Sequence, residues 1–407
     1  MRFFANERGI KMKYTLYGDG IHDDTNAIQQ MIDSSCELSL PVPEKFYLIS
    51  KPLELPSKFK LKLPRFAEIR LAPGSNCVMA KNKTKINNHP KNDTEKIWSY
   101  LDFYSPDAPC ENIEIEGGVW NFNNKNQKAN PISDGIWEPK GYSGYLMLFY
   151  NVKNLKLSHL TLKDPCTFSV TLDTVSYFSI SDINFDFNDG NLYQSNMDGI
   201  HLNGNCHHGN IEKLFGTCYD DVVAMNANEG SAGTIHDISV RGIYTEGSYS
   251  AVRLLTSNAD CAVRNVHISD IYGTFYHFAV SFQHYFKSEE RGLIENVTLE
   301  NVFAAKSDRN LVKFPRVHNY RNYGLIDFES HNDIKNLVVR NIHRSEYIDA
   351  NPTILAAGDI MMENVVFDNI TTENYIVNAR IELVQSKAVI KNLRTQGLYL
   401  NGKEINF

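Results

Sequence analysis

Ten segments of this chain repeat one pattern, which restricts the possible folds more than any other feature. In each copy a polar residue, often Asn, precedes an apolar-polar-apolar stretch, and a polar pair and a second apolar-x-apolar stretch follow. Repetition at periods of about 20 to 50 residues indicates a solenoid, because one coil cannot bury its apolar face alone and its neighbours complete the core. The copies are residues 111–122, 153–164, 176–187, 209–217, 236–246, 264–274, 295–305, 335–345, 362–373 and 388–400.

The make-up of the copies distinguishes among the repeat folds. Leucine-rich repeats would show a fixed Leu/Asn ladder with shorter, regular periods, and a propeller would show blades of about 40 residues with four strands each. Here each copy has two or three brief apolar stretches, turns of variable length and Asn at the bends. We therefore predict an all-β fold, a right-handed single-stranded parallel β-helix, in which the Asn residues form stacked turn ladders.

The start of the chain differs from the repeats. Residues 14–35 predict a short strand, a Gly-rich turn and a helix, with Asp23, Asp24 and Thr25 as capping groups and apolar residues at helical spacing after them. An uncapped end of a β-solenoid exposes apolar side chains and unpaired strand edges. We therefore predict a strand and a capping helix in residues 1–44, followed by a β-helix of one domain over residues 45–407.

Charge and cysteine usage exclude several kinds of partner. The formal net charge is -7 over 407 residues, whereas a nucleic-acid-binding domain is normally basic or carries a basic stripe. We therefore expect no nucleic-acid partner. We also expect no membrane span and no secretory signal, because no run approaches about 20 apolar residues and charges interrupt the first 15 residues.

The cysteines indicate the compartment. Seven scattered cysteines without a C-x-x-C pair favour a reducing compartment. A cytoplasmic protein is expected, with a phage-derived or non-classically exported one as the alternative.

Three short β-type segments, residues 196–204, 218–227 and 250–256, provide the candidate site. If Ile200 and Leu202 face inward, the alternation of side chains along a strand also places Val223, Met225, Val252 and Leu254 inward. Polar side chains then occupy the outward positions, and acidic residues stand where the strands begin. Because parallel strands lie about 4.8 Å apart, we expect one solvent-facing patch formed by Asp198, His201, Asn203, Asp220, Asp221, Asn226 and Arg253.

Both the start of the chain and the three central segments resemble a known family. The sequence YGDGIHDDTNAIQQMID (residues 17–33) is similar to the opening motif of the pectate-lyase-like β-helix superfamily, which includes polygalacturonase-type enzymes and phage tailspikes. The segments NMDG, YDDVVAM and AVRLL resemble, in the same order, the Asn-Thr-Asp, Gly-Asp-Asp and Arg-Ile-Lys motifs of glycoside hydrolase family 28. The resemblance in fold extends over most of the chain, whereas the resemblance in catalytic motifs is confined to the central coils.

This resemblance implies a glycosidase that acts on an oligo- or polysaccharide by inverting acid/base catalysis. It implies Asp220 as the general acid, Asp198 and Asp221 as bases, and no metal or other cofactor. Crowded carboxylates cannot all ionise, so one of them retains a proton for the leaving group. Inversion normally requires the acid and the base to lie about 6.5 to 9.5 Å apart. His201, Asn203, Asn226, Arg253, Tyr219 and Tyr249 are the expected substrate-binding residues.

The chain also departs from the family's motifs. The family's Gly-His-Gly is missing between Asp221 and Arg253; His236 lies there, in a segment expected to face inward, and His201 is the candidate replacement. Leu255 stands where the family has a lysine, which disfavours a uronate substrate because the cation that would pair with its carboxylate is lost. A lyase or epimerase, using a Tyr, His, Lys or Arg base, and a non-catalytic, tailspike-like carbohydrate-binding solenoid are the alternatives. The oligomer, a monomer or a homotrimer, stays open.

Overall fold

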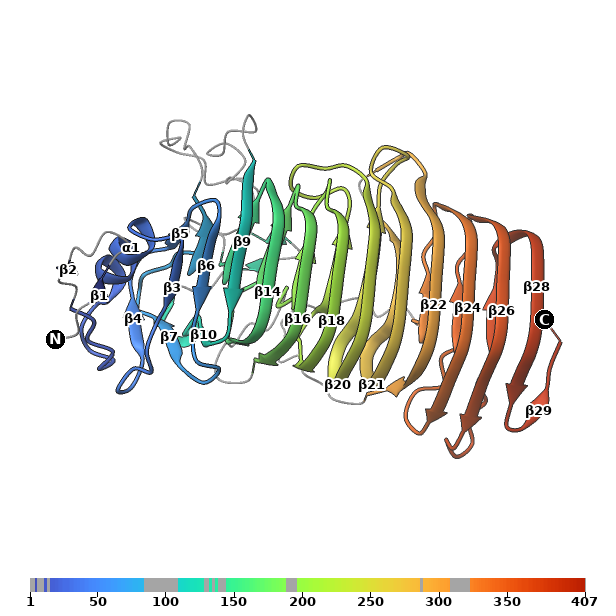
Figure 1. Ribbon diagram of the computed structural model, residues 1–407. Coiled ribbons are helices and arrows are strands. Elements are labelled where there is room, and N and C mark those ends of the chain that lie inside the picture. Colours follow the sequence, from blue (N-terminus) through green and yellow to red (C-terminus); the bar gives the residue numbers. More distant parts are fainter. Residues whose placement is uncertain are drawn as a thin grey trace. The chain divides into compact units, whose positions relative to one another are not determined.

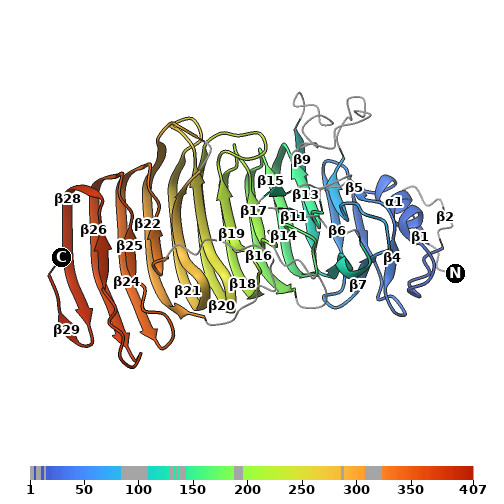
Figure 2. The same ribbon diagram turned by 180° about the vertical axis from the view of Figure 1, so that it is seen from behind.

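The computed structural model describes residues 15–83, 109–127, 144–187, 196–285, 288–307 and 323–406, and the backbone of four short strands outside these ranges. Two compact units make up the chain, Met1–Met197 and Asp198–Phe407. In each unit, short strands from successive coils lie side by side in parallel (Figures 1 and 2). The prediction that residues 45–407 form a single domain stays a prediction.

The first unit contains the helix and sixteen strands among the described residues. Its stacked strands pair in parallel, for example β6 with β9 and β9 with β14, whereas β1–β2 and β11–β12 are antiparallel. The elements are β1 (Phe4–Ala5), β2 (Lys11–Met12), α1 (Thr25–Asp33), β3 (Glu37–Ser39), β4 (Tyr47–Ile49), β5 (Leu53–Leu55), β6 (Phe59–Lys62), β7 (Glu68–Leu71), β8 (Ala80–Asn82), β9 (Cys110–Glu116), β10 (Val119–Asn121), the 3-10 helix η2 (Asn124–Asn126), β11 (Ile132–Ser133), β12 (Ile136–Trp137), β13 (Met147–Tyr150), β14 (Val152–Lys163), β15 (Val170–Asp173) and β16 (Ser176–Asp186).

The second unit repeats a long strand and a short strand in most coils. Long strands pair with long strands and short with short, as in β22–β24–β26–β28 and β23–β25–β27, all parallel. The elements are β17 (Ile200–Leu202), β18 (His207–Thr217), β19 (Asp221–Asn226), β20 (Ile235–Thr256), β21 (Val263–His284), β22 (Gly292–Lys306), β23 (Ile326–Phe328), β24 (Asn332–Glu346), β25 (Ile354–Ala356), β26 (Ile360–Asn374), β27 (Val384–Ser386), β28 (Val389–Leu400) and β29 (Lys403–Glu404).

The apolar positions of the repeats form the core. In β26, for example, Val365, Phe367 and Ile370 are at most 1% exposed, and they continue rows from Leu337, Val339 and Ile342 of β24. Each row of apolar side chains is removed from water only when the next coil covers it. The repeat pattern therefore predicted both the core and the parallel stacking.

An Asn ladder runs along one bend of the second unit, as predicted. Each amide donates to the amide oxygen of the previous coil: Asn296 to Asn265 at 2.9 Å, Asn336 to Asn296 at 2.8 Å and Asn364 to Asn336 at 2.9 Å. These residues have positive φ, which Asn tolerates better than other residues with a side chain. The ladder thus forms the turn and joins neighbouring coils with one side chain.

Replacing Asn336 with Ala is expected to lower the free energy of unfolding by roughly 2 kcal/mol, because Ala loses two exposed hydrogen bonds and strains the left-handed backbone. Asn336→Gly removes the same hydrogen bonds without that strain, so it should cost only about 1 kcal/mol. Urea denaturation of both variants measures the difference. Equal losses for Ala and Gly would show that the left-handed backbone does not determine the residue at this bend.

Helix α1 covers the first coil of the first unit, as the sequence predicts. Ile28, Met31 and Ile32 are buried on one face, and the Gln29 side chain pairs with the backbone of Glu54 in β5, donating to its carbonyl at 3.0 Å and accepting from its N–H at 2.8 Å. The Asp24 carboxylate does not cap the helix; it accepts hydrogen bonds from the preceding Gly-rich turn instead. The helix therefore protects a strand that would otherwise expose its edge.

Two further features concern the cysteines and the possible membrane spans. All seven cysteines are free thiols. Within the described residues, no helix combines the length and apolar character needed to cross a membrane.

Candidate active site

The strands β17, β19 and β20 carry the predicted inward and outward rows. Ile200 pairs with Val223 and Val223 with Val252, and the parallel row runs from Leu202 through Met225 to Leu254. All six side chains are 0% exposed. The row between them brings His201, Ala224 and Arg253 side by side on successive coils. The predicted strand phase is therefore confirmed.

The three predicted carboxylates converge at the starts of these strands. One oxygen from each of Asp198, Asp220 and Asp221 lies within 4.8 Å of the others. The Asp221 N–H donates to Asp198 Oδ1 at 3.1 Å, which holds the two coils in register. The carboxylate oxygens are thus closer than the expected 6.5 to 9.5 Å, because Asp220 and Asp221 are consecutive residues and Asp198 lies on the adjacent coil, one strand spacing away.

Arg253 supplies the positive charge of the cluster. Its Nε lies 2.9 Å from Asp221 Oδ2, although the N–H does not point at that oxygen, so the contact is an ion pair rather than a hydrogen bond. The Arg253 Nη2 group donates a hydrogen bond to Asp220 Oδ1 at 3.4 Å. The guanidinium thus balances part of the charge of an acidic site that is largely shielded from water.

The prediction of a solvent-facing patch is wrong for most of these side chains. Asp198, His201, Asn203, Asp221 and Asn226 are between 0% and 4% exposed. The turn after β19 folds back against part of this row: Gly204 donates its N–H to the Glu229 carbonyl, Glu229 donates its own N–H to the Asn226 carbonyl, and the Glu229 carboxylate contacts His201 and Asn226. Within the predicted patch, only the Asp220 and Arg253 side chains are partly exposed, at 16% and 23%. Asp220 is therefore the carboxylate of the three that a substrate can reach most directly.

His201 joins two carboxylates inside the site. Its Nδ1 lies 2.6 Å from Asp198 Oδ2, and its Nε2 lies 3.0 Å from both Glu229 Oε2 and Asn203 Oδ1. Burial alone would lower the pKa of His201, but hydrogen bonds from the ring to Asp198 and Glu229 raise it to about 10. The ring is therefore an imidazolium that donates from both nitrogens and fixes the Asp198 carboxylate.

Glu229 belongs to the site although it was not predicted. Its carboxylate also accepts a hydrogen bond from the Asn226 amide at 3.0 Å. Burial opposes ionisation of Glu229, but the bond from His201 prevails and lowers its pKa. The available signal in the sequence was an acidic residue in the segment NANEG, three residues after Asn226, the second outward Asn.

The charge state of the aspartate pair follows from burial. Burial raises the pKa of Asp221 well above its usual range, the nearby carboxylates of Asp220 and Asp198 raise it further, and the Arg253 guanidinium opposes the change. The Asp221 carboxyl thus favours binding of a proton in the free protein. Because the negative charge of Asp220 is one cause of this raised pKa, protonation of Asp221 depends on the charge of its neighbour.

Several buried polar atoms of the site lack a hydrogen-bond partner among the described residues. They include Asn226 Oδ1 and the Ser281 hydroxyl. Ser281 lies in β21, one coil further on, where it pairs with Arg253 of β20. Asp221 Oδ1 accepts no hydrogen bond of ordinary geometry, although the Ser250 hydroxyl lies close enough to favour its ionised form. Such atoms are normally satisfied by water or ligand groups, so the cluster has spare capacity for polar ligands.

The two tyrosines predicted to bind substrate are both largely buried. Tyr219 is 7% exposed and immediately precedes the acidic pair. Tyr249, 9% exposed, belongs to an aromatic group with Tyr276 and His277, whose ring centroids lie 5.7 and 3.7 Å from its own. Burial and the negative charge of Asp220 raise the pKa of Tyr249. Tyr249 thus remains a neutral phenol beside the carboxylates.

The acidic cluster also has the donor type of a hard cation site, since three carboxylate oxygens suit Ca²⁺ or Mg²⁺. Arg253 already places its charge against two of these carboxylates. The prediction that no metal takes part stays a prediction.

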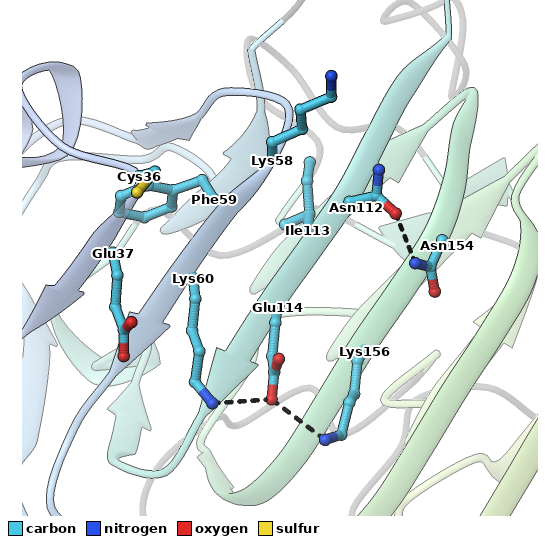
Figure 3. Close-up of a pocket in the computed structure, with 10 residues that line it drawn as sticks. All are labelled: Cys36, Glu37, Lys58, Phe59, Lys60, Asn112, Ile113, Glu114, Asn154 and Lys156. Carbon is cyan, nitrogen blue, oxygen red and sulfur yellow. Dashed lines mark hydrogen bonds and ion pairs between the residues drawn. The ribbon is translucent and has the colours of Figure 1, made fainter.

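A surface hollow on the first unit has a different character (Figure 3). There Lys60 and Lys156 lie 3.2 and 3.1 Å from the same oxygen of Glu114, and Asn154 donates to Asn112. None of the predicted site residues lines it. Two lysines thus already flank the Glu114 carboxylate, and the hollow lies away from the converging aspartates.

The fold and the acidic cluster together define a parallel β-helix protein with a polar site on its stacked strands. The chain belongs to the glycosyl hydrolases family 28, because the model of that family matches residues 52–302, more than half of the chain. This match includes all the predicted site residues and confirms the resemblance seen in the motifs.

Solved structures with the same fold differ in activity. Similar ones are the tailspike protein of E. coli bacteriophage HK620 in complex with a pentasaccharide (14% identity, 95% of this chain and 65% of that chain, TM-score 0.60), the Streptococcus pneumoniae surface adhesin PfbA (14%, 95% and 90%, 0.56), and a Yersinia enterocolitica family 28 exopolygalacturonase (15%, 93% and 76%, 0.53). At these identities the likeness shows the fold alone, and it confirms the predicted right-handed parallel β-helix. No curated protein matches the sequence closely enough to count as a relative.

Proposed function

We propose that this protein is a glycoside hydrolase that cleaves an oligo- or polysaccharide by inverting acid/base catalysis with three aspartates. The convergence of Asp198, Asp220 and Asp221 beside Arg253 is the observation that supports this most strongly. Membership of the glycosyl hydrolases family 28 supports this reaction class, and the cluster contains the carboxyl groups that the reaction requires.

Asp220 is the proposed general acid. It is the most accessible of the three carboxyls, and its proton passes to the glycosidic oxygen as the bond from that oxygen to the anomeric carbon breaks. When Asp220 is protonated, Asp221 is the ionised member of the pair, and Arg253 at 2.9 Å stabilises its charge. Asp198 and Asp221 then take a proton from the water whose oxygen bonds to the anomeric carbon.

The positioning of Asp198 supports a base rather than a nucleophile. One of its oxygens accepts the Asp221 N–H and the other accepts from His201, and the side chain is 4% exposed. Direct attack on a sugar ring would require a more accessible carboxylate. We therefore propose that the reaction inverts the anomeric configuration, although the carboxylates lie closer together than in most inverting enzymes. Proton NMR of the first-formed anomer tests this, and a product of retained configuration would contradict it.

The proposed substrate is a glycan without carboxylate groups at the cleaved residue. Both cations of the described site are already paired, Arg253 with two aspartates and His201 with Asp198 and Glu229. Leu255, 8% exposed, stands at the position of the family's lysine. A uronate would therefore bring its negative charge next to an acidic cluster with no cation reserved for it.

A panel of neutral and uronate-containing glycans tests the function. We expect release of reducing ends from at least one neutral oligo- or polysaccharide and little or none from polygalacturonate. A new absorbance from an unsaturated product would indicate a lyase instead. Binding of a glycan that is never turned over, with a trimeric assembly, would support the non-catalytic alternative.

A further inference from the structure

The second unit contains another cluster of titratable side chains, where β18 and β20 begin. His207 and His208 are the first residues of β18, and His236 and Asp237 follow the first residue of β20. His207 is paired with His236 in the sheet, and their rings are stacked with centroids 4.8 Å apart. Neither the family's motifs nor the proposed hydrolysis uses these residues. The expectation that His236 faces inward is wrong, since its side chain is 34% exposed.

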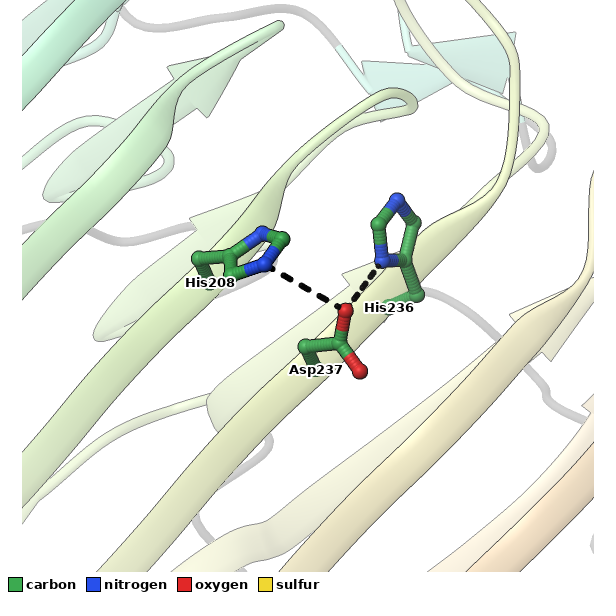
Figure 4. Close-up of side chains that lie close together, drawn as sticks. All are labelled: His208, His236 and Asp237. Atoms are coloured by element: carbon green, nitrogen blue, oxygen red, sulfur yellow. Dashed lines mark hydrogen bonds and ion pairs between the residues drawn. The ribbon is translucent and has the colours of Figure 1, made fainter.

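Two imidazoles converge on one carboxylate in this cluster (Figure 4). Asp237 Oδ2 lies 2.7 Å from His236 Nδ1 and 3.7 Å from His208 Nε2. One ligand atom from each of the three residues lies within 4.8 Å of the other two, and the side chains are between 34% and 44% exposed. A cation from solvent can therefore reach all three without opening the core.

The same cluster interrupts the Asn ladder. His208 and Asp237 have φ of 55° and 58°, like Asn265 and Asn296 of the following coils. The Asn265 amide donates to Asp237 Oδ1 at 2.9 Å, just as Asn296 donates to Asn265. Asn could form the turn at both positions, so the backbone alone does not explain why His208 and Asp237 stand there. Asp237 Oδ1 accepts the ladder hydrogen bond from Asn265, and Asp237 Oδ2 faces the two imidazoles.

We propose that His208, His236 and Asp237 form a binding site for a divalent transition-metal ion of the zinc type. Imidazole nitrogens and a carboxylate oxygen suit zinc and its neighbours, whereas Mg²⁺ and Ca²⁺ prefer oxygen ligands alone. Metal–ligand distances of about 2.0 to 2.2 Å require only small side-chain rotations from the observed separations. The ion ties β18 to β20, and the Asn265 amide orients the carboxylate from its other oxygen. Water or His207 completes the coordination.

Zn²⁺ titrated calorimetrically into the chelator-treated full-length chain tests this site. We expect one equivalent to bind, and we expect the double variant His208→Asn/Asp237→Asn to bind at least tenfold more weakly. These substitutions install the residue that the ladder uses in later coils, so the turn is retained while two ligands are lost. His236→Gln removes the third ligand separately. Co²⁺ provides a second readout, because imidazole coordination changes its visible absorption.

A second His–Asp pair offers a matched control. His331 Nδ1 lies 2.8 Å from Asp359 Oδ2, and both residues have positive φ, but Arg291 at 2.7 Å already occupies Asp359. The control variant His331→Asn/Asp359→Asn should therefore bind Zn²⁺ as the unmodified chain does. The proposal is overturned if the chain binds no Zn²⁺, if the ladder variant binds as tightly as the unmodified chain, or if the control weakens binding equally. None of these outcomes depends on glycan hydrolysis.

Discussion

Replacing Asp220 with Asn is expected to lower kcat on a glycan substrate by about 10²- to 10⁴-fold, the usual contribution of a general acid. The amide fills nearly the same space but cannot transfer a proton to the glycosidic oxygen. Asp220 is also the most accessible of the three aspartates, so neither Asp198 nor Asp221 can readily take its place. Steady-state hydrolysis of the best substrate from the glycan panel measures the loss.

The leaving group distinguishes loss of the acid from general damage to the site. An aryl glycoside with an acidic phenol departs without protonation, so Asp220→Asn should retain far more of its rate on that substrate than on the natural glycan. Asp260→Asn, the same change at an exposed loop position, serves as the control and should hydrolyse both substrates normally. If Asp220→Asn loses both activities equally while its circular dichroism and melting are unchanged, Asp220 is not the general acid.

The sequence predicted the parts of this site that follow from strand periodicity. The positions of Ile200, Val223 and Val252 in the core fix which neighbouring side chains point outward, because alternation along a strand has a period of two. Acids far apart in the chain can therefore be assigned to one cluster from the sequence. The capping helix and the Asn ladder follow in the same way from local spacing.

Features that depend on a turn folding back were not predictable. Nothing in the spacing places Glu229 against His201, because that contact depends on the bend after β19. The bend brings the Glu229 carboxylate against His201, and the buried Asp198 and Asp221 carboxylates pair with His201 and Arg253 inside the site. Burial and ion pairing, rather than the order of motifs, thus determine the protonation states on which the proposed chemistry relies.

The charged His201 gives the last prediction, which concerns stability against pH. Raising the pKa of His201 from 6.5 to about 10 on folding corresponds to about 5 kcal/mol of stabilisation while the ring is protonated. Because the folded-state pKa lies above the unfolded one, this stabilisation is fully present below about pH 6.5 and is lost as the pH rises through 10. We expect the free energy of unfolding to fall by several kcal/mol over that window.

His201→Gln should remove this pH dependence. The amide can still donate a hydrogen bond to one carboxylate, but it carries no charge, so the variant should be less stable at pH 6 and should approach the unmodified protein near pH 10. His267→Gln, at an exposed histidine bonded to Glu300, should leave the slope unchanged. Urea denaturation between pH 6 and 10 measures all three proteins. If the free energies of unfolding of His201→Gln and the unmodified protein change in parallel with pH, the His201 ring is neutral in the folded protein. Asp198, His201 and Glu229 would then form a neutral hydrogen-bond network in which one carboxyl keeps its proton, and the ion triad would be excluded.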